Sequence, residues 1–231
     1  MRRSPGKLRV AVTATNPFDA PVDEEAVRGL RVGAELLAAL GHEVVEAAPS
    51  WPTPESLGVF ISVFGPAIAL AIDAGVRRAG REPGEDEIEP LSRVLYERSR
   101  STPAVTYLGA VAQMQAIARG LVAFFADYDL LMTPGLAERP LRIGECNGLG
   151  SDPMADLERS GLFTPYTSLF NVTGQPAISI PVGFGPDGLP TNVQLVGRPL
   201  NEDRLLQVAL QMEAAHPWAH HRPPSAPGES A

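Results

Sequence analysis

The amino-acid sequence predicts an α/β fold in which one mixed β-sheet is flanked by helices. Two observations support this prediction. A strand, a helix and a second strand follow one another within residues 8–47, and such a unit joins parallel strands. Near the C-terminal end, two apolar strand patterns flank a turn rich in glycine and proline, which is typical of an antiparallel hairpin.

The first unit carries clear boundary signals. Residues 8–15, LRVAVTAT, form an apolar run of strand length. Asp23 is placed to cap a helix whose apolar residues recur at helical spacing as far as Leu40. Gly41 then occupies the position of a left-handed C-cap, and residues 42–47, HEVVEA, form the second strand.

The middle of the chain is predicted to be helical. The segment 55–80 is strongly apolar, and Pro66 within it indicates a kink or a helix start. A charged turn separates this segment from a helix near residues 91–100. Another helix is expected to begin around Pro103, a residue that suits the first turn, and to end near Ala126.

A further apolar strand is predicted at residues 130–134, LLMTP. Residues 135–161 are rich in glycine, proline and polar residues, so they are expected to form a loop that holds about one helical turn. Thr164 and Pro165 are then placed to cap a helix that continues through Asn171.

The predicted hairpin consists of residues 177–182 and 192–198. The Gly-x-Gly-x-x-Gly pattern between these strands also matches the dinucleotide-binding fingerprint, which requires a helix N-terminus directly after it. A proline and an alternating strand pattern follow instead, so the hairpin interpretation is favoured and no nucleotide cofactor is expected. Asn201 is placed to cap a last helix over residues 202–215.

Composition and charge set the broad class of protein. The net charge of -8 argues against a general attraction to nucleic acid or to an anionic membrane. No window is expected to supply the ~20 apolar residues of a membrane span, and no secretory leader is recognised. The single cysteine, Cys146, favours a cytoplasmic location. Without a clear linker, residues 1–215 are predicted to form one domain, followed by a mobile, proline-rich tail over 216–231.

Two groups of residues suggest other functions. His216, His220 and His221 have a spacing that could bind a metal ion, but they lie among prolines, so a solvated tail is favoured and no metal is expected. Cys146 lies in a polar segment without a neighbouring base or helix N-terminus to activate it. An enzyme that uses this thiol therefore stays a minor alternative.

Three blocks of sequence are informative together. Residues 8–49 contain LRVAV, VDEEAV and LGHEVVEAAP, and residues 128–134 read YDLLMTP. Residues 163–210 are the most specific, because NVTGQPA, ISIPVG, GLP and VQLVG follow one another there. In this order and spacing, the blocks resemble the C-terminal half of enzymes of the amidase-signature family. They extend over nearly the whole chain.

The resemblance implies part of an α/β/α sandwich and hydrolysis of carboxamides through an acyl-enzyme. In the family, a lysine activates a bridging serine, which activates the nucleophilic serine, and a Gly/Ser-rich loop forms the oxyanion hole. This chain contains no Ser-Ser pair, and its one lysine, Lys7, lies near the N-terminal end. In relatives the catalytic residues precede the equivalent of Leu8, so no catalytic residue is assigned in this chain.

By their position in the family pattern, Phe163, Thr164 and Thr167 are expected to border the substrate cleft, although core packing and helix capping explain them equally well. We predict an amidase-like chain that is a truncated or split part of an amide hydrolase and is inactive alone. Its expected partners are a small-molecule amide and a complementary N-terminal amidase chain. The alternative is a non-catalytic binding or assembly partner built from half of the fold. Sheet edges and apolar helix faces are expected to be exposed when the other half is missing.

Overall fold

The computed structural model describes residues 4–53 and 56–221. Within this part of the chain, five strands form one sheet in the order β2-β1-β3-β5-β4. β1 pairs in parallel with β2 and β3, whereas β5 runs antiparallel to β3 and β4. The predicted mixed sheet is therefore confirmed. The strands are β1 (Arg9–Val12), β2 (Glu43–Glu46), β3 (Leu130–Pro134), β4 (Ala177–Phe184) and β5 (Pro190–Gly197).

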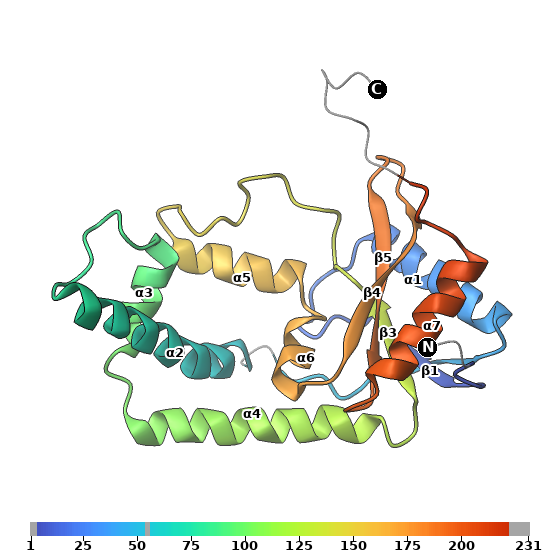
Figure 1. Cartoon of the computed structure of the whole chain (residues 1–231), viewed down its shortest axis with the longest axis horizontal. Coiled ribbons are helices and arrows are strands. Elements are labelled where there is room, and N and C mark those ends of the chain that lie inside the picture. Colours follow the sequence, from blue (N-terminus) through green and yellow to red (C-terminus); the bar gives the residue numbers. More distant parts are fainter. Residues whose placement is uncertain (1–3, 54–55, 222–231) are drawn as a thin grey trace.

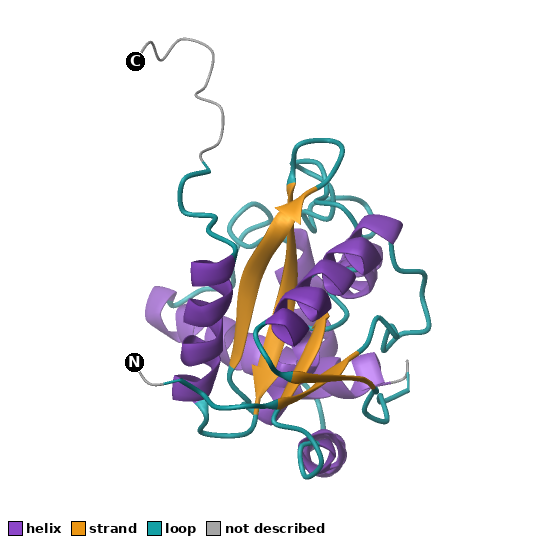
Figure 2. Cartoon of the chain, turned by 90° about the vertical axis from the view of Figure 1, so that its right-hand side faces the viewer, coloured by secondary structure: helices purple, strands orange, loops and turns teal. Residues whose placement is uncertain are grey.

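Helices flank both faces of this sheet. Figure 1 shows α1 and α7 on one side, and α4 and α6 on the other, while α2, α3 and α5 extend away from the strands. In Figure 2 the sheet lies behind α1 and α7. The helices are α1 (Glu24–Ala39), α2 (Ser56–Ala79), α3 (Pro90–Ser99), α4 (Ala104–Phe124), α5 (Pro153–Phe163), α6 (Ser168–Thr173) and α7 (Glu202–Ala215).

Two clusters of buried apolar side chains hold these layers together. On one face of the sheet, Leu37 of α1 and Val208 of α7 belong to a cluster with the alternate residues of β3, β4 and β5. On the other face, Phe170 of α6 and Phe125, which follows α4, pack with Ala11 of β1. The alternation of side chains along each strand supplies both clusters, because successive residues point to opposite faces.

The N-terminal unit forms as its boundary signals predict. The side chain of Asp23 accepts a hydrogen bond from the backbone N–H of Glu25 at 2.8 Å and so caps α1. Gly41 follows the helix with a φ of 91°, a left-handed conformation that glycine adopts without steric cost. The chain then enters β2 parallel to β1.

The segment between β3 and α6 is more helical than the sequence indicates. The expectation of a loop with about one helical turn over residues 135–161 is wrong, because α5 runs for 11 residues. Asp152 caps it by accepting from Ala155 N, and Pro153 occupies its first turn. The helix predicted from Thr164 begins later, at α6, because Thr164 ends α5 by donating its N–H to Ser160 O.

Helix α2 differs from the expectation that no window is long and apolar enough to cross a membrane. Its 24 residues are long and apolar enough to cross a membrane by length and composition. A window of 18 residues within it has a mean hydropathy of 2.0, and 11% of that window is buried. Pro66 lies inside the helix, and Asp73 accepts a hydrogen bond from the hydroxyl of Tyr96 in α3. Length and composition alone are weak evidence for a membrane span. The structure shows an apolar helix of which few residues are buried.

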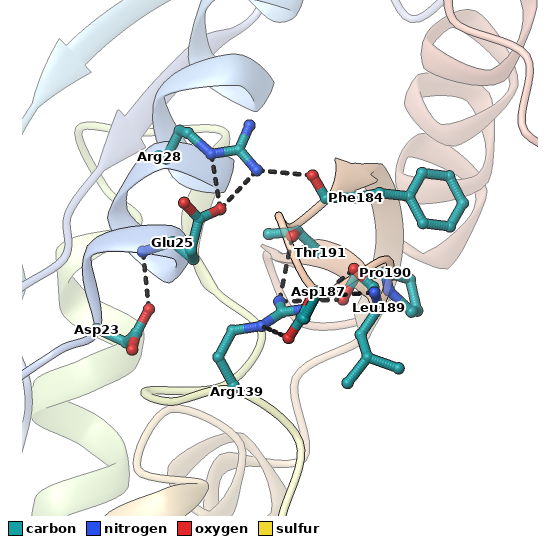
Figure 3. A network of polar contacts seen from close by, with 9 residues as sticks. All are labelled: Asp23, Glu25, Arg28, Arg139, Phe184, Asp187, Leu189, Pro190 and Thr191. Carbon is teal, nitrogen blue, oxygen red and sulfur yellow. Dashed lines mark hydrogen bonds and ion pairs between the residues drawn. The ribbon is translucent and has the colours of Figure 1, made fainter.

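Strands β4 and β5 form the predicted hairpin, connected by residues 185–189. Gly185 N donates to Leu189 O within this connection. Because β5 and not a helix follows the turn, the hairpin interpretation of the Gly-x-Gly-x-x-Gly pattern is confirmed. Figure 3 shows Arg139, from the segment after β3, holding the tip of the hairpin, and Arg28 of α1 donating to Phe184 O.

The described part of the predicted tail contacts the domain. Trp218 packs against the cluster that lies under α1 and α7. The ring of His221 lies 4.7 Å from that of Phe184, measured between ring centroids. The remainder of the tail, residues 222–231, lies outside the described residues.

A candidate substrate pocket

A pocket of about 160 Å³ lies where four helices meet. Its walls come from α2, α4, α5 and α6, together with Phe18 from the turn after β1 and Thr164 from the connection between α5 and α6. Figure 1 shows these four helices gathered on the side of the sheet away from α1 and α7. The lining residues are Phe18, Ser56, Leu57, Val59, Phe60, Met114, Ile117, Leu157, Ser160, Gly161, Thr164, Ser168, Leu169 and Val172.

Most of the lining is apolar. Leu57 and Phe60 are three residues apart on α2, as are Met114 and Ile117 on α4, so each pair presents one face of its helix to the pocket. Leu157 of α5 completes this side of the lining. The arrangement resembles the small-molecule sites of proteins in general, which are concave and mainly hydrophobic.

Four hydroxyl groups interrupt the apolar lining. The hydroxyl of Thr164 is already engaged, because it donates to Ser160 O at 2.9 Å. The side-chain hydroxyls of Ser56, Ser160 and Ser168 form no hydrogen bond with any group in the described part of the chain. They are therefore available to a bound molecule.

The described lining residues include no group that could activate one of these hydroxyls. None of the described residues that line it is acidic, basic or a histidine. Lys7 is exposed and precedes β1, and it does not line the pocket. Among the described residues, no cluster of histidine, cysteine and carboxylate side chains is arranged to hold a metal ion. The pocket can bind and orient a ligand, but these residues supply neither a general base nor an activated nucleophile.

The three residues expected to border the cleft lie next to one another but differ in role. Thr164 lines the pocket. Thr167 precedes α6 and donates its hydroxyl to Thr164 O at 3.2 Å, and Phe163 accepts through its carbonyl from Ala137 N. Neither Phe163 nor Thr167 is among the lining residues. The contributions of α2 and α4 were not foreseen, because apolar residues at helical spacing indicate core packing equally well.

The alternative chemical groups lie elsewhere. Cys146 is partly buried in the loop before α5, with a φ of 57°, and does not line the pocket. His220 and His221 lie with their ring centroids 4.1 Å apart beyond α7. None of these three residues is among those that line the pocket.

Comparison with known proteins gives consistent matches over the whole fold. A family model described as Amidase matches residues 1–206. The 6-aminohexanoate-cyclic-dimer hydrolase of Pseudomonas sp. (strain NK87) is 35% identical over 228 residues, which cover 95% of this chain and 46% of that protein. The protein of the same name from Paenarthrobacter ureafaciens is also 35% identical, with the same coverage.

Comparison with solved structures gives a match to a protein of the same name. The solved structure of a 6-aminohexanoate cyclic dimer hydrolase superposes with a TM-score of 0.84 at 35% identity, covering 96% of this chain and 47% of that structure. This chain therefore spans about half the length of the curated relatives that it matches.

Proposed function

Because this chain belongs to the amidase family, we propose that it forms the C-terminal part of an enzyme that hydrolyses carboxamides to a carboxylate and ammonia or an amine. In this proposal, the chain supplies a wall of the substrate cleft and no catalytic residue. The pocket between α2, α4, α5 and α6 is the observation that carries it, because its free hydroxyls and apolar lining can hold an amide but cannot cleave one.

The residue types in the chain support the proposal that it supplies a wall of the cleft and no catalytic residue. Amide hydrolysis through a serine requires a base that is neutral when it takes the proton of the hydroxyl. The chain has one lysine, Lys7, which is exposed, and it has no adjacent pair of serines. The nucleophile and its base then come from a complementary amidase part, either a separate chain or a preceding segment of the same polypeptide.

The uncovered helices support such a complementary part. Leu70 of α2 is 66% exposed, and Val105 of α4 is 83% exposed. Phe64 and Leu108 on the same two helices are also exposed. Exposed apolar side chains on two packed helices are typical of an interface. The same surface favours the second candidate function, a non-catalytic assembly partner that docks through α2 and α4.

A chimera separates these possibilities. The part of the Pseudomonas relative that precedes the matched region is joined to residues 1–231, and release of ammonia from a panel of primary amides is measured. The chimera is expected to hydrolyse amides, whereas this chain alone and the relative's part alone are expected to release none. Turnover by the purified chain alone, retained through a second purification, would contradict the proposal. A chimera that melts cooperatively but cleaves no amide would favour the assembly partner.

A further inference from the structure

We infer that the pocket selects an uncharged carboxamide whose apolar group has about the size of a phenyl ring. The inference rests on the proposed function, because it assigns the chemical class of the amide that the same pocket holds. Three properties of the described lining residues carry it: the volume that they enclose, their lack of charge, and three hydroxyl groups without a hydrogen-bond partner in the described part of the chain.

Volume limits the apolar group. The pocket measures about 160 Å³. A dry protein cavity of ~150 Å³ lined by leucine, isoleucine and phenylalanine binds benzene. Phe60, Ile117 and Leu157 give this pocket a similar lining, so a phenyl ring or a short aliphatic chain is the group that fits.

The lack of charge excludes ionised amides. None of the lining residues that the structure describes carries a carboxylate, an ammonium, a guanidinium or an imidazole group. A charged group that enters such a site loses its hydration without gaining a partner of opposite charge, which is strongly unfavourable. An amide with a free carboxylate or ammonium on its apolar part is therefore rejected.

The free hydroxyls select the amide group. A serine hydroxyl both donates and accepts hydrogen bonds, and a primary carboxamide offers N–H donors and a carbonyl acceptor. Ser160 and Ser168, from α5 and α6, and Ser56, from the first turn of α2, line the pocket without a partner in the described part of the chain. They are placed to bind the amide of a ligand whose ring lies among the apolar side chains.

Binding to the whole chain tests this inference without any turnover. Benzamide, 4-carbamoylbenzoate and 4-(aminomethyl)benzamide share a ring and a primary amide, and they are neutral, anionic and cationic. Their dissociation constants are measured by ligand-observed NMR titration. Benzamide is expected to bind saturably and at least tenfold more tightly than either charged analogue. Similar affinities for all three, or no saturable binding of benzamide, would overturn the inference.

Two glycine variants locate the binding site. A Cβ atom added at Gly161 or at Gly109 has no heavy atom within 4 Å, and both glycines lie in helices. A Cβ atom therefore meets no clash at either position, and leucine has a higher helix propensity than glycine. Gly161→Leu places a side chain in the pocket and is expected to abolish benzamide binding. Gly109→Leu, outside the pocket on α4, is expected to leave it unchanged. Equal binding by both variants would place the ligand elsewhere and overturn the inference.

Turnover by the chimera separates this inference from the proposed function. An active chimera with kcat/KM at least tenfold higher for benzamide than for its charged analogues supports both. An active chimera without this preference would contradict the inferred selectivity of the pocket, while the proposed amide hydrolysis would still hold. A folded chimera that binds benzamide selectively but hydrolyses no amide would contradict the proposed function, while the inferred selectivity of the pocket would still hold.

Discussion

The guanidinium of Arg139 binds the carboxylate of Asp187 through two parallel hydrogen bonds, Nε to Oδ2 at 2.9 Å and Nη2 to Oδ1 at 2.6 Å. The hydrogen bonds from Arg139 hold the pKa of Asp187 below its usual range. The same guanidinium donates to the carbonyl oxygens of Leu189 and Pro190 (Figure 3). One side chain from the segment after β3 thus fixes the far end of the β4–β5 hairpin.

Replacing Arg139 should destabilise the fold more than replacing Asp187. Arg139→Ala removes the ion pair together with the hydrogen bonds to the carbonyl oxygens of Leu189 and Pro190, and Leu189 O keeps only the hydrogen bond from Gly185 N. Asp187→Ala removes the ion pair and the hydrogen bond that Leu189 N donates to Asp187 Oδ1, but it leaves the guanidinium free to bind the carbonyl oxygens. Urea denaturation gives both free energies of unfolding. Equal losses, or a larger loss for Asp187→Ala, would mean that the carbonyl contacts are unimportant.

Close packing between α1 and β5 gives a second prediction. A Cβ atom at Gly29 would lie 2.3 Å from Cγ2 of Thr191, a buried side chain. Gly29→Ala should therefore destabilise the chain by about 1–3 kcal/mol, because overpacking outweighs the gain in helix propensity. Gly75→Ala, in open space on α2, should instead stabilise it by up to about 1 kcal/mol. Chemical denaturation of both variants measures the difference, and a stabilising Gly29→Ala would refute the close approach.

The turn between α2 and α3 should contribute stability that depends on pH. Hydrogen bonds from Arg81, and then from Gly84 N, lower the pKa of Glu87 from 4.5 to about 2. Because the folded-state pKa is depressed, the contribution of Glu87 is complete above about pH 4.5 and is lost as the pH falls towards 2.

The variant Glu87→Gln tests this dependence. Its difference in unfolding free energy from the unmodified chain should be constant from pH 7 to about pH 5 and should shrink between pH 4.5 and pH 2. Glu85→Gln, which removes a negative charge from the same turn, is the control for the change in net charge. A Glu87→Gln difference that persists at pH 2 would disprove the assigned cause.

The uncovered apolar surface of α4 should promote self-association. Val105 and Leu108 are 83% and 62% exposed on this helix. Changing both to glutamate should reduce association, measured by light scattering after size-exclusion chromatography, while the unfolding free energy changes by less than ~0.5 kcal/mol. Leu210→Glu, on the exposed side of α7, is the control and should have little effect on association. Unchanged self-association of the double variant would show that the chain does not associate through α4.

Local signals in the sequence were sufficient for much of the fold. The cap at Asp23, the left-handed Gly41 and the turn between β4 and β5 each depend on a few neighbouring residues, and each forms as predicted. Helix α5 also had such signals, because Asp152 and Pro153 form a cap and a first turn. The glycine-rich composition around them obscured this pattern.

The order of the strands and the pocket depend on contacts between distant residues. Nothing local indicates that β3 lies between β1 and β5, because that order depends on pairing between strands that are far apart in the sequence. In the same way, Met114 and Ile117 carry no signal that separates a pocket wall from a core helix. Thr164 was found only through the family pattern.

The location of the nucleophile tests the central claim most directly. A fluorophosphonate reacts covalently with a serine whose hydroxyl is activated as a nucleophile. The chimera and this chain alone are treated with such a probe, and the labelled peptides are identified by mass spectrometry. We predict that the label is found only in the relative's part of the chimera and that the chain alone takes up none. A labelled serine within residues 1–231, for example Ser160 or Ser168 in the pocket, would contradict the account.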